Sequence, residues 1–325
     1  MKICLGIEST AHTFGAAIVD FDGNILSNAR DMYTTSSGGL VLTDVARHHE
    51  AVKEEILEKA MKDAKVTWND IDLISVASSP GLSLALIVGV KFAKKLAIMH
   101  NKPLIGVNHC VAHLTIGNLM TKLKDAVYLY VSGPNTQVVA KMGNRFRVFG
   151  ETVDIGLGNA LDKFGRVLSL GFPGGPKIEQ LAKKGKYVEL PYSIKGMDVS
   201  FAGLLTKAER LFKQGAKAED LCYSIQETAF AMLAEVSERA LAHCEKNELI
   251  LIGGVAANKR LCKMLEKMCR QRNARFGACP LQYAGDQGVM IAWQGILEFK
   301  AGRQDNPKTL DMDPFKRTDD IDIIW

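Results

Sequence analysis

The chain opens with short apolar runs separated by small polar turns. The runs "ICLGIE" (3–8), "AAIVD" (16–20) and "ILSNAR" (25–30) are joined by the turns "STAHTFG" and "FDGN". Apolar runs of this length between turns rich in Gly, Ser and Asn are typical of strands joined by tight hairpins. The pattern predicts a three-stranded meander.

The same pattern returns at residue 127, where "VYLYV", "QVVAKM" and "RFRVFGETV" alternate with the turns "SGPNT" and "GN". Each meander is followed by helical sequence and then by two segments that read as strand, turn and helix. In the first half these segments are 44–64, 71–97 and 103–120, and in the second half 224–246, 247–271 and 274–299. The repeated order of elements predicts a duplicated α/β fold, although the two halves share no identity.

Each half would form a mixed sheet with helices on its faces. This plan resembles the two-lobed actin-like ATPase architecture, a ribonuclease H-like duplication. We expect an N-terminal lobe at 1–125 that carries a histidine pair and a C-terminal lobe at 126–325. A helical, glycine-rich insertion is expected at about 150–210 of the second lobe. The last helix and the tail, about 295–325, are expected to be able to pack back on the first lobe.

The composition of the 325 residues, with 47% hydrophobic and 24% charged, is typical of a soluble globular protein. Lysines interrupt the longest apolar run, 82–99, so we expect no membrane span. Seven cysteines without a CxxC pair, and no signal-peptide pattern, predict reduced thiols and a cytoplasmic protein. The net charge of +5 permits an anionic partner without requiring one.

Two histidines four positions apart, His109 and His113, occur in "VNHCVAHLTIG" (107–117). On a helix this spacing places both imidazoles on one face, where they can share a metal ion. One buried histidine beside a solvated one would have the same spacing, so both interpretations stay open. A zincin-type protease is excluded because Cys110 stands where the H-E-x-x-H motif needs its glutamate base.

Asp286, in "YAGDQG", lies between a predicted strand and a predicted helix. It could be only the helix N-cap. If the two lobes face each other, it instead opposes the histidine pair. Together with Tyr130, the two histidines and this carboxylate make a nitrogen and oxygen ligand set suited to Fe(II) or Zn.

Several glycine-containing turns are candidates for binding a phosphate or a nucleotide. Backbone N–H groups and hydroxyls of "GIESTAHTFG", with Glu8, Ser9 and Thr10, could form a phosphate hairpin, and "YVSGPNTQVV" repeats the device. The Gly-Gly turn in "LILIGGVAANKRL" allows close approach of a flat ligand, with Asn258 at the start of the next helix. A plain hairpin or a helix cap is the alternative for each motif, and the Gly-Gly turn is the more specific of the signals.

Asp162, Lys163 and Glu179 are charged residues beside glycine turns of the insertion, and the two carboxylates could bind ribose hydroxyls or an amine. Solvated acids near a helix start are the simpler alternative. For nucleic acid, the basic stretch "NKRLCKMLEKMCRQRNAR" and Lys183, Lys184 and Lys186 are possible phosphate contacts, and an ordinary solvated helix face explains them equally well.

Taken in order, the motifs of the chain resemble one family. They are "GIESTAHTFG", "VNHCVAHL", "YVSGPNTQV", "GNALDKFGR", "FPGGPKIEQLA", "DVSFAGL", "SIQETAFAML", "IGGVAANKRL" and "KRTDDIDIIW". The resemblance is to the threonylcarbamoyl-adenosine tRNA modification family, called TsaD in bacteria and once described as an O-sialoglycoprotein endopeptidase. "HTFGAAIVD" and "RTDDIDIIW" resemble its archaeal and eukaryotic branch, the catalytic subunit of the KEOPS complex.

The resemblance implies a tRNA N6-adenosine threonylcarbamoyltransferase. The threonylcarbamoyl group would move from threonylcarbamoyl-AMP to N6 of adenosine 37 in tRNAs that read ANN codons, with no protein nucleophile. Its implied metal ligands are His109, His113, Tyr130 and Asp286. Its implied substrate contacts are Tyr130, Val131, Ser132, Gly133, Pro134, Asp162, Gly175, Glu179 and Asn258.

The resemblance further implies one divalent metal ion, iron before zinc or magnesium, and an adenine nucleotide or threonylcarbamoyl-AMP. The implied partners are the tRNA anticodon loop, a small kinase-like subunit, a small dimerising subunit and an upstream threonylcarbamoyl-AMP synthase. No membrane partner is expected. The alternatives are a small-molecule kinase of the same architecture, which needs no paired histidines, and a non-catalytic nucleotide-binding scaffold.

Four positions depart from the family pattern: Ser79 replaces a glycine, Pro134 a glycine, Ala202 a serine and Gln287 an asparagine. Each lies next to a motif residue and could alter affinity or rate. Pro134 also removes one backbone donor from its hairpin. His48 and His49 in "ARHHEAV" resemble a family pair, but the sequence suggests no role for them.

Overall fold

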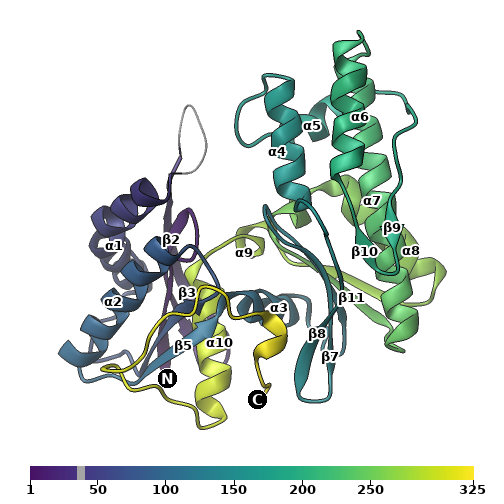
Figure 1. Ribbon diagram of the computed structural model, residues 1–325. Coiled ribbons are helices and arrows are strands. Elements are labelled where there is room, and N and C mark those ends of the chain that lie inside the picture. Colours follow the sequence, from purple (N-terminus) through teal and green to yellow (C-terminus); the bar gives the residue numbers. More distant parts are fainter. Residues whose placement is uncertain (35–40) are drawn as a thin grey trace. The chain divides into compact units, whose positions relative to one another are not determined.

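The computed structural model describes residues 1–34 and 41–325. It divides the chain into two compact units, Met1–Leu119 with Asp286–Trp325, and Met120–Gly285. Each unit is built on a five-stranded sheet (Figure 1). No helix within the described residues is both long and apolar enough to cross a membrane.

The sheet of the first unit has the strand order β3-β2-β1-β4-β5. The predicted meander is β1 (Ile3–Glu8), β2 (Thr13–Asp20) and β3 (Ile25–Met32), paired antiparallel. β4 (Leu73–Ser79) and β5 (Leu104–Asn108) extend the sheet in parallel. β2 begins inside the predicted turn because Thr13 and Phe14 continue the ladder with β3.

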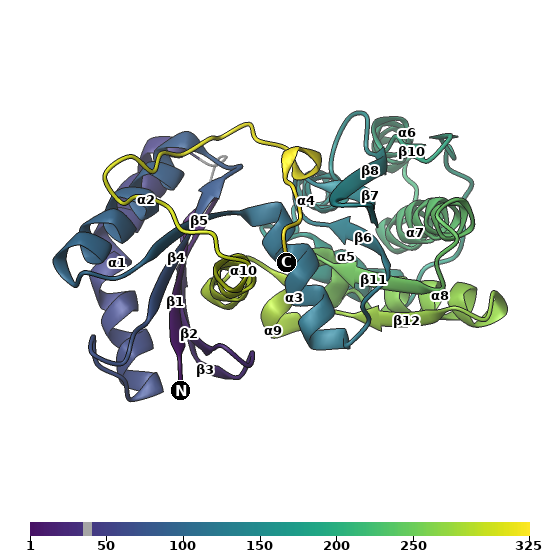
Figure 2. The ribbon, with the colours of Figure 1, turned by 90° about the horizontal axis from the view of Figure 1, so that it is seen from below.

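Helices cover both faces of this sheet (Figure 2). α1 (Leu42–Ala64) and α2 (Ser83–Met99) lie on one face, and α10 (Gly288–Lys300) lies on the other. α3 (His109–Thr121) follows β5 directly. The core on the α1 and α2 face is aliphatic and aromatic, with Leu5, Ile7, Phe14 and Ile74 fully buried.

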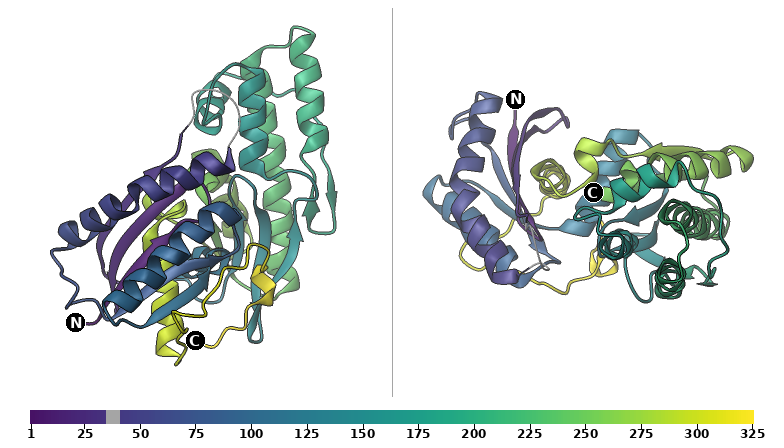
Figure 3. Two further views of the ribbon diagram at one scale, coloured as in Figure 1. Left: turned by 60° about the vertical axis from the view of Figure 1, so that its left-hand side comes forward. Right: turned by 90° about the horizontal axis from the view of Figure 1, so that it is seen from above.

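The tail after α10 runs back over the first unit (Figure 3). Asp305 pairs with Leu104 beside β5, the backbone N–H of Asp313 donates to the carbonyl of Ser78, and that of Gly81 donates to the carbonyl of Pro314. A short helical turn, η2 (Thr318–Asp320), follows. The tail is therefore an integral part of this unit.

The second unit repeats the plan. β6 (Val127–Val131), β7 (Thr136–Met142) and β8 (Arg145–Glu151) form its meander. β11 (Glu248–Ile252) and β12 (Arg275–Ala278) extend it in parallel, giving the order β12-β11-β6-β7-β8. Because both sheets have the same order and the same strand directions, the predicted duplication is confirmed.

The helices of the second unit are α7 (Ala218–His243), α8 (Lys259–Gln271) and the short α9 (Leu281–Ala284), with the turn η1 (Gly254–Ala257) after β11. The expected insertion between β8 and α7 contains α4 (Leu157–Val167), α5 (Gly175–Ala182) and α6 (Ala202–Lys213). A two-stranded sheet, β9 (Ile194–Lys195) with β10 (Asp198–Val199), was not predicted. Such short strands carry too few residues to show a period in the sequence.

Glycines allow α10 to approach β1 closely. A Cβ atom on Gly6 would lie 2.2 Å from the carbonyl oxygen of Gly288, and one on Gly288 would lie 2.6 Å from the backbone nitrogen of Ala17. Both distances are far below van der Waals contact, so neither position accommodates a side chain without movement of the backbone. This contact sets the position of the first residues of α10, and Asp286 precedes them.

We expect Gly6→Ala to lower the free energy of unfolding by about 2–4 kcal/mol, because overpacking between a strand and a helix is costly. Gly203→Ala in α6 is the matched control, since nothing lies within 4 Å of the added Cβ. There alanine should stabilise the helix by about 0.5–1 kcal/mol. Urea unfolding of both variants measures the difference, and equal effects would contradict the packing argument.

Candidate metal and nucleotide site

α3 begins with the histidine pair because β5 ends at a capping residue. The side-chain oxygen of Asn108 accepts from the backbone N–H of Val111 at 3.0 Å, as an N-cap does. The amide nitrogen of Asn108 donates to the carbonyl of Lys316 in the tail at 3.2 Å. An asparagine directly before the histidine pair is the sequence signal for this cap, and the sequence-based reasoning missed it.

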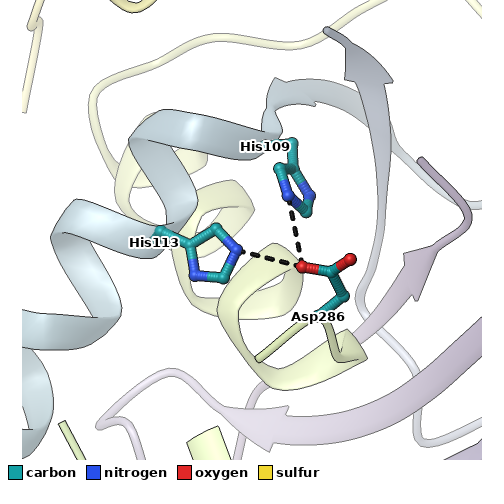
Figure 4. A group of neighbouring side chains, drawn as sticks. All are labelled: His109, His113 and Asp286. Atoms are coloured by element: carbon teal, nitrogen blue, oxygen red, sulfur yellow. Dashed lines mark hydrogen bonds and ion pairs between the residues drawn. The ribbon is translucent and has the colours of Figure 1, made fainter. Parts of the chain in front are cut away.

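His109 and His113 point toward the same carboxylate (Figure 4). Asp286 Oδ1 lies 3.5 Å from Nε2 of His109 and 3.2 Å from Nε2 of His113. One ligand atom of each residue lies within 4.8 Å of the others. Both histidines are buried, with His113 only 1% exposed. The structure therefore favours a shared site over the alternative of one buried and one solvated histidine.

Asp286 is not the cap of α10. The N-cap is Gln287, whose side-chain oxygen accepts from the backbone N–H of Met290 at 3.1 Å. The carboxylate of Asp286 is thus available to the histidines. α3 and α10 are also joined by a hydrogen bond at 2.9 Å from the hydroxyl of Thr115 to Gln294, which holds the two elements of the site together.

A second carboxylate lies on the far nitrogen of His109. Glu8 Oε2 is 2.9 Å from Nδ1 of His109, and the hydroxyl of Thr10 is 3.1 Å from the same atom. Glu8 is fully buried at the end of β1, where its other oxygen accepts from the backbone N–H of Thr10 at 2.6 Å. The predicted phosphate hairpin of Glu8, Ser9 and Thr10 stays a prediction, and its Thr10 N–H already has this partner.

The charges of the site oppose the effect of burial. Burial alone lowers the pKa of His109, but the negative charges of Glu8 and Asp286 raise it well above its ordinary value. Burial raises the pKa of Asp286, but the charge of His109 and the hydrogen bonds from both histidines hold it well below its ordinary value. Burial lowers the pKa of His113. Both shifts favour an ion pair between His109 and Asp286.

These residues fit a divalent metal ion. Two imidazole nitrogens and one carboxylate oxygen converge, which is a donor set suited to iron or zinc. A carboxylate on the second nitrogen of a ligating histidine fixes its tautomer and orientation, and Glu8 has that position on His109. Tyr130, the fourth predicted ligand, lies on β6 of the other unit and stays a prediction.

In the second unit, the predicted substrate residues form one hydrogen-bonded arrangement that starts at the β6–β7 hairpin. The carbonyl oxygens of Ser132 and Gly133 accept from the N–H groups of Gly158 and Asn159 at the start of α4. Gly253 lies against Val131, because a Cβ there would be 2.3 Å from its carbonyl oxygen. The hairpin therefore touches both the insertion and the Gly-Gly turn.

The arrangement continues through the insertion. Asp162 on α4 accepts from the backbone N–H of Gly174 at 2.7 Å and so sets the start of α5 at Gly175. Glu179 on α5 accepts from the backbone N–H of Lys259 at 3.0 Å. Asn258, the residue before Lys259, caps α8, and its side-chain nitrogen donates to Gln226 at 2.8 Å. The capping interpretation of Asn258 holds, and a ribose contact stays a prediction.

Two of the four departures, Ser79 and Gln287, make local contacts through their side chains, and the other two contribute backbone atoms. Ser79 accepts from the amide of Asn108 at 3.5 Å, and Gln287 caps α10. The backbone N–H of Ala202 donates to Asp154 at the start of α6. Pro134 lies in the hairpin and contributes its carbonyl to the close contact with Gly156.

Comparison with known proteins agrees with the family resemblance of the motifs. The model of the TsaD family, described as tRNA N6-adenosine threonylcarbamoyltransferase, matches residues 24–293. A protein of that name from Thermococcus sibiricus is 50% identical over 325 residues, which cover 99% of this chain and 100% of the relative. The chain belongs to the TsaD family. A further relative, from Archaeoglobus fulgidus, is 48% identical, with 99% of each chain covered.

TsaD relatives also occur within longer chains. The "probable bifunctional tRNA threonylcarbamoyladenosine biosynthesis protein" of Methanocaldococcus jannaschii is 48% identical over 324 residues, and this chain spans 60% of it.

Solved structures agree on the fold of this TsaD member. HypF from Thermococcus kodakarensis matches 92% of this chain and 48% of its own with a TM-score of 0.64 at 16% identity. Component A of the (R)-2-hydroxyglutaryl-CoA dehydratase of Acidaminococcus fermentans matches 93% of this chain and 100% of its own with a TM-score of 0.58 at 13% identity. The predicted actin-like ATPase fold is thereby confirmed.

Metal binding by this TsaD member is expected to strengthen with pH. An ion at Nε2 of His109 displaces a proton whose pKa the charges of Glu8 and Asp286 raise, so the apparent association constant should rise about tenfold per pH unit below the raised pKa. Titrations with Zn(II) between about pH 6 and 7 measure this slope. Glu8→Gln should flatten it, whereas Glu58→Gln, on the exposed face of α1, should not. Equal affinities across that pH range in the wild-type protein would contradict the assignment.

Proposed function

We propose that this TsaD member transfers the threonylcarbamoyl group from threonylcarbamoyl-AMP to N6 of adenosine 37 in tRNAs that read ANN codons. Formation of threonylcarbamoyladenosine in tRNA follows from the family, and the chain is a transferase. The donor, the position and the codon class are supported by the motifs that the chain shares with the family. The observation that carries the proposal is the convergence of His109, His113 and Asp286.

The family implies a metal ion and a nucleotide-related substrate. We propose His109, His113, Asp286 and Tyr130 as ligands, and iron before zinc or magnesium as the metal. When bound, a divalent ion supplies Lewis acidity that polarises a carbonyl oxygen. Glu8 and Thr10 hold the imidazole of His109 from behind, through the Nδ1 contacts at 2.9 and 3.1 Å.

The second unit is proposed to bind the adenylate. The hairpin Tyr130–Pro134 would contact the donor, with Asp162, Gly175, Glu179 and Asn258 around the nucleoside. This proposal is supported by the continuous hydrogen bonds that join the hairpin, α4, α5 and the start of α8. Asp162 and Glu179 use one oxygen each on backbone N–H groups, so each carboxylate keeps an oxygen for ribose hydroxyls. AMP is a good leaving group, so no protein nucleophile is needed.

The family modifies tRNA, and we propose contacts with the anticodon loop. Arg260 of the basic stretch forms a bidentate ion pair with Glu227 at 2.6 and 2.5 Å, so the exposed lysines of α8 are better candidates for phosphate contacts. We also propose cytoplasmic localisation, KEOPS-type partners including a small kinase-like and a small dimerising subunit, and a separate threonylcarbamoyl-AMP synthase. The name of the bifunctional relative, with its second biosynthetic part, supports a shared pathway.

Reconstitution tests the proposal directly. Unmodified tRNA, threonine, bicarbonate, ATP, the adenylate-forming enzyme and the partner subunits are combined with this chain, and digested tRNA is analysed by mass spectrometry. We expect threonylcarbamoyladenosine with the wild-type chain and at least about a hundredfold less with His109→Ala/His113→Ala, since the ligand pair is lost. His243→Ala, an exposed histidine on α7, is the control.

Each other outcome has a defined meaning. Product that persists in the double variant would overturn the metal role and leave the transferase. Loss of product with the control variant as well would mean that the substitutions act through folding. No product from a complete complex that binds nucleotide would favour the scaffold, and ATP-dependent phosphorylation of a small molecule would favour the kinase.

A further inference from the structure

A second histidine pair, His48 and His49 on α1, connects the surface to the loop behind the metal site. Nε2 of His48 lies 2.6 Å from Oδ1 of Asp31 on β3, and the Nδ1 atoms of the two histidines are 3.2 Å apart. Nε2 of His49 lies 2.9 Å from the carbonyl oxygen of Ala11. The contacts form one continuous relay from a half-exposed carboxylate to the backbone of the β1–β2 loop.

The partners determine where the protons of the relay are. A carbonyl oxygen only accepts, so Nε2 of His49 carries the hydrogen that it donates to Ala11. Burial lowers the pKa of His49 to about 4, so its ring is neutral near pH 7 and its Nδ1 accepts. Nδ1 of His48 must then donate to His49. Its Nε2 faces the carboxylate of Asp31 at 2.6 Å, and this contact holds the orientation of the His48 ring.

Burying the imidazole of His49 costs free energy that an apolar side chain at the same position would not cost. His49 is fully buried between α1 and β2, with its ring edge on Phe14 at a centroid distance of 5.7 Å. An apolar side chain there would need no partner, whereas the polar nitrogens of a buried imidazole must be hydrogen-bonded. What the imidazole adds, compared with an apolar side chain, is a hydrogen bond that fixes the carbonyl of Ala11.

Ala11 is next to Thr10, which touches the metal site. The loop is also anchored on both sides of Ala11, because the carbonyl of Thr10 accepts from Leu82 N–H and that of His12 accepts from Tyr33 N–H, each at 2.8 Å. Thr10 in turn bonds to Glu8, and both contact Nδ1 of His109. The orientation of the Ala11 carbonyl thus constrains the residue that sets His109.

We propose that Asp31, His48 and His49 are positioning residues for the metal site, because their relay fixes Ala11 and through it the Thr10 and Glu8 contacts to His109. The inference deepens the proposed function and rests on the metal role of His109. The relay residues do not touch the proposed substrate or metal. They act through the backbone of the β1–β2 loop.

The test uses two substitutions at His49 that differ in reach. The side-chain nitrogen of glutamine can replace Nε2 and donate to Ala11, whereas that of asparagine matches only Nδ1 and stops short. His49→Asn should speed backbone amide exchange across 9–13 by about tenfold or more. It should also shift the imidazole ¹⁵N signals of His109 in the metal-free protein. His49→Gln should restore both toward wild type.

Asp31→Asn tests the relay from its surface end without a change in the core. Without the carboxylate that orients His48, the imidazole ¹⁵N signals of His48 should shift, and exchange across 9–13 should rise. Asp63→Asn is the matched control, since it removes an exposed carboxylate from α1, the helix that carries His48. It should change neither the His48 signals nor the exchange across 9–13. Zn(II) affinity should fall roughly three- to tenfold in His49→Asn, less than for a residue that touches a ligand directly.

Unchanged exchange across 9–13 in both His49→Asn and Asp31→Asn would overturn the proposal. So would faster exchange with unchanged His109 shifts, because the loop would then be structural only. These readouts are made on the metal-free protein. A wild-type chain that binds no Zn(II) or Fe(II) would therefore overturn the proposed metal function, while the exchange and shift data still decide whether the relay orients His109.

Discussion

A single imidazole between two carboxylates, one fully buried and one partly buried, is the constraint around which the first unit is organised. His109 has Glu8 at Nδ1 and Asp286 at Nε2, and Glu8 is fully buried. Removing carboxylates from water, wholly or in part, costs free energy unless they are paired and hydrogen-bonded. The protein meets this cost with Thr10 on Glu8 and with both histidines on Asp286. A cation at Nε2 would take over the compensation that the proton on His109 provides in its absence.

The rest of the unit keeps these three residues together. They come from the end of β1, the start of α3 and the residue before Gln287, the cap of α10, so their meeting depends on how these elements pack. Glycine contacts press α10 against β1, and the Thr115–Gln294 hydrogen bond joins α10 to α3. The tail adds a hydrogen bond from Asn108 to Lys316, at the N-terminus of α3. Each of these contacts limits the movement of an element that carries one of the three residues.

The second unit has its own sheet with the same strand order, but it uses the loops of that sheet to hold an insertion. Its hairpin carbonyls are used on the N–H groups of α4, and its acidic residues hold the starts of α5 and α8. Glycines at 156, 158 and 253 allow these backbones to approach each other closely. An insertion attached by backbone contacts in this way has a defined position on the sheet, and the proposed nucleotide contacts depend on that position. The lobe boundary expected at residue 125 and the role of Tyr130 as a ligand stay predictions.

Local pattern determined the part of this protein that depends on neighbours in the sequence. Apolar runs and polar turns predicted both meanders, because strands covered on both faces of a sheet are apolar along their length and turns between them are polar. The i, i+4 spacing of His109 and His113 predicted that they share a helix face, because an α-helix has 3.6 residues per turn. The family motifs, read in order, then pointed to tRNA threonylcarbamoylation, which the relatives support.

The tertiary structure decided what depends on residues far apart in the chain. Asp286 could have been a helix cap, and only the side chain of Gln287 on Met290 showed that it is not. The pairing of Glu8 with His109 joins residues 101 positions apart, and the relay from Asp31 to Ala11 joins three separate elements. The periodicity of a sequence does not predict such contacts, because they form only when strands and helices pack together. Whether two polar side chains then form a hydrogen bond depends on the positions of their atoms, and the residue types alone do not give these positions.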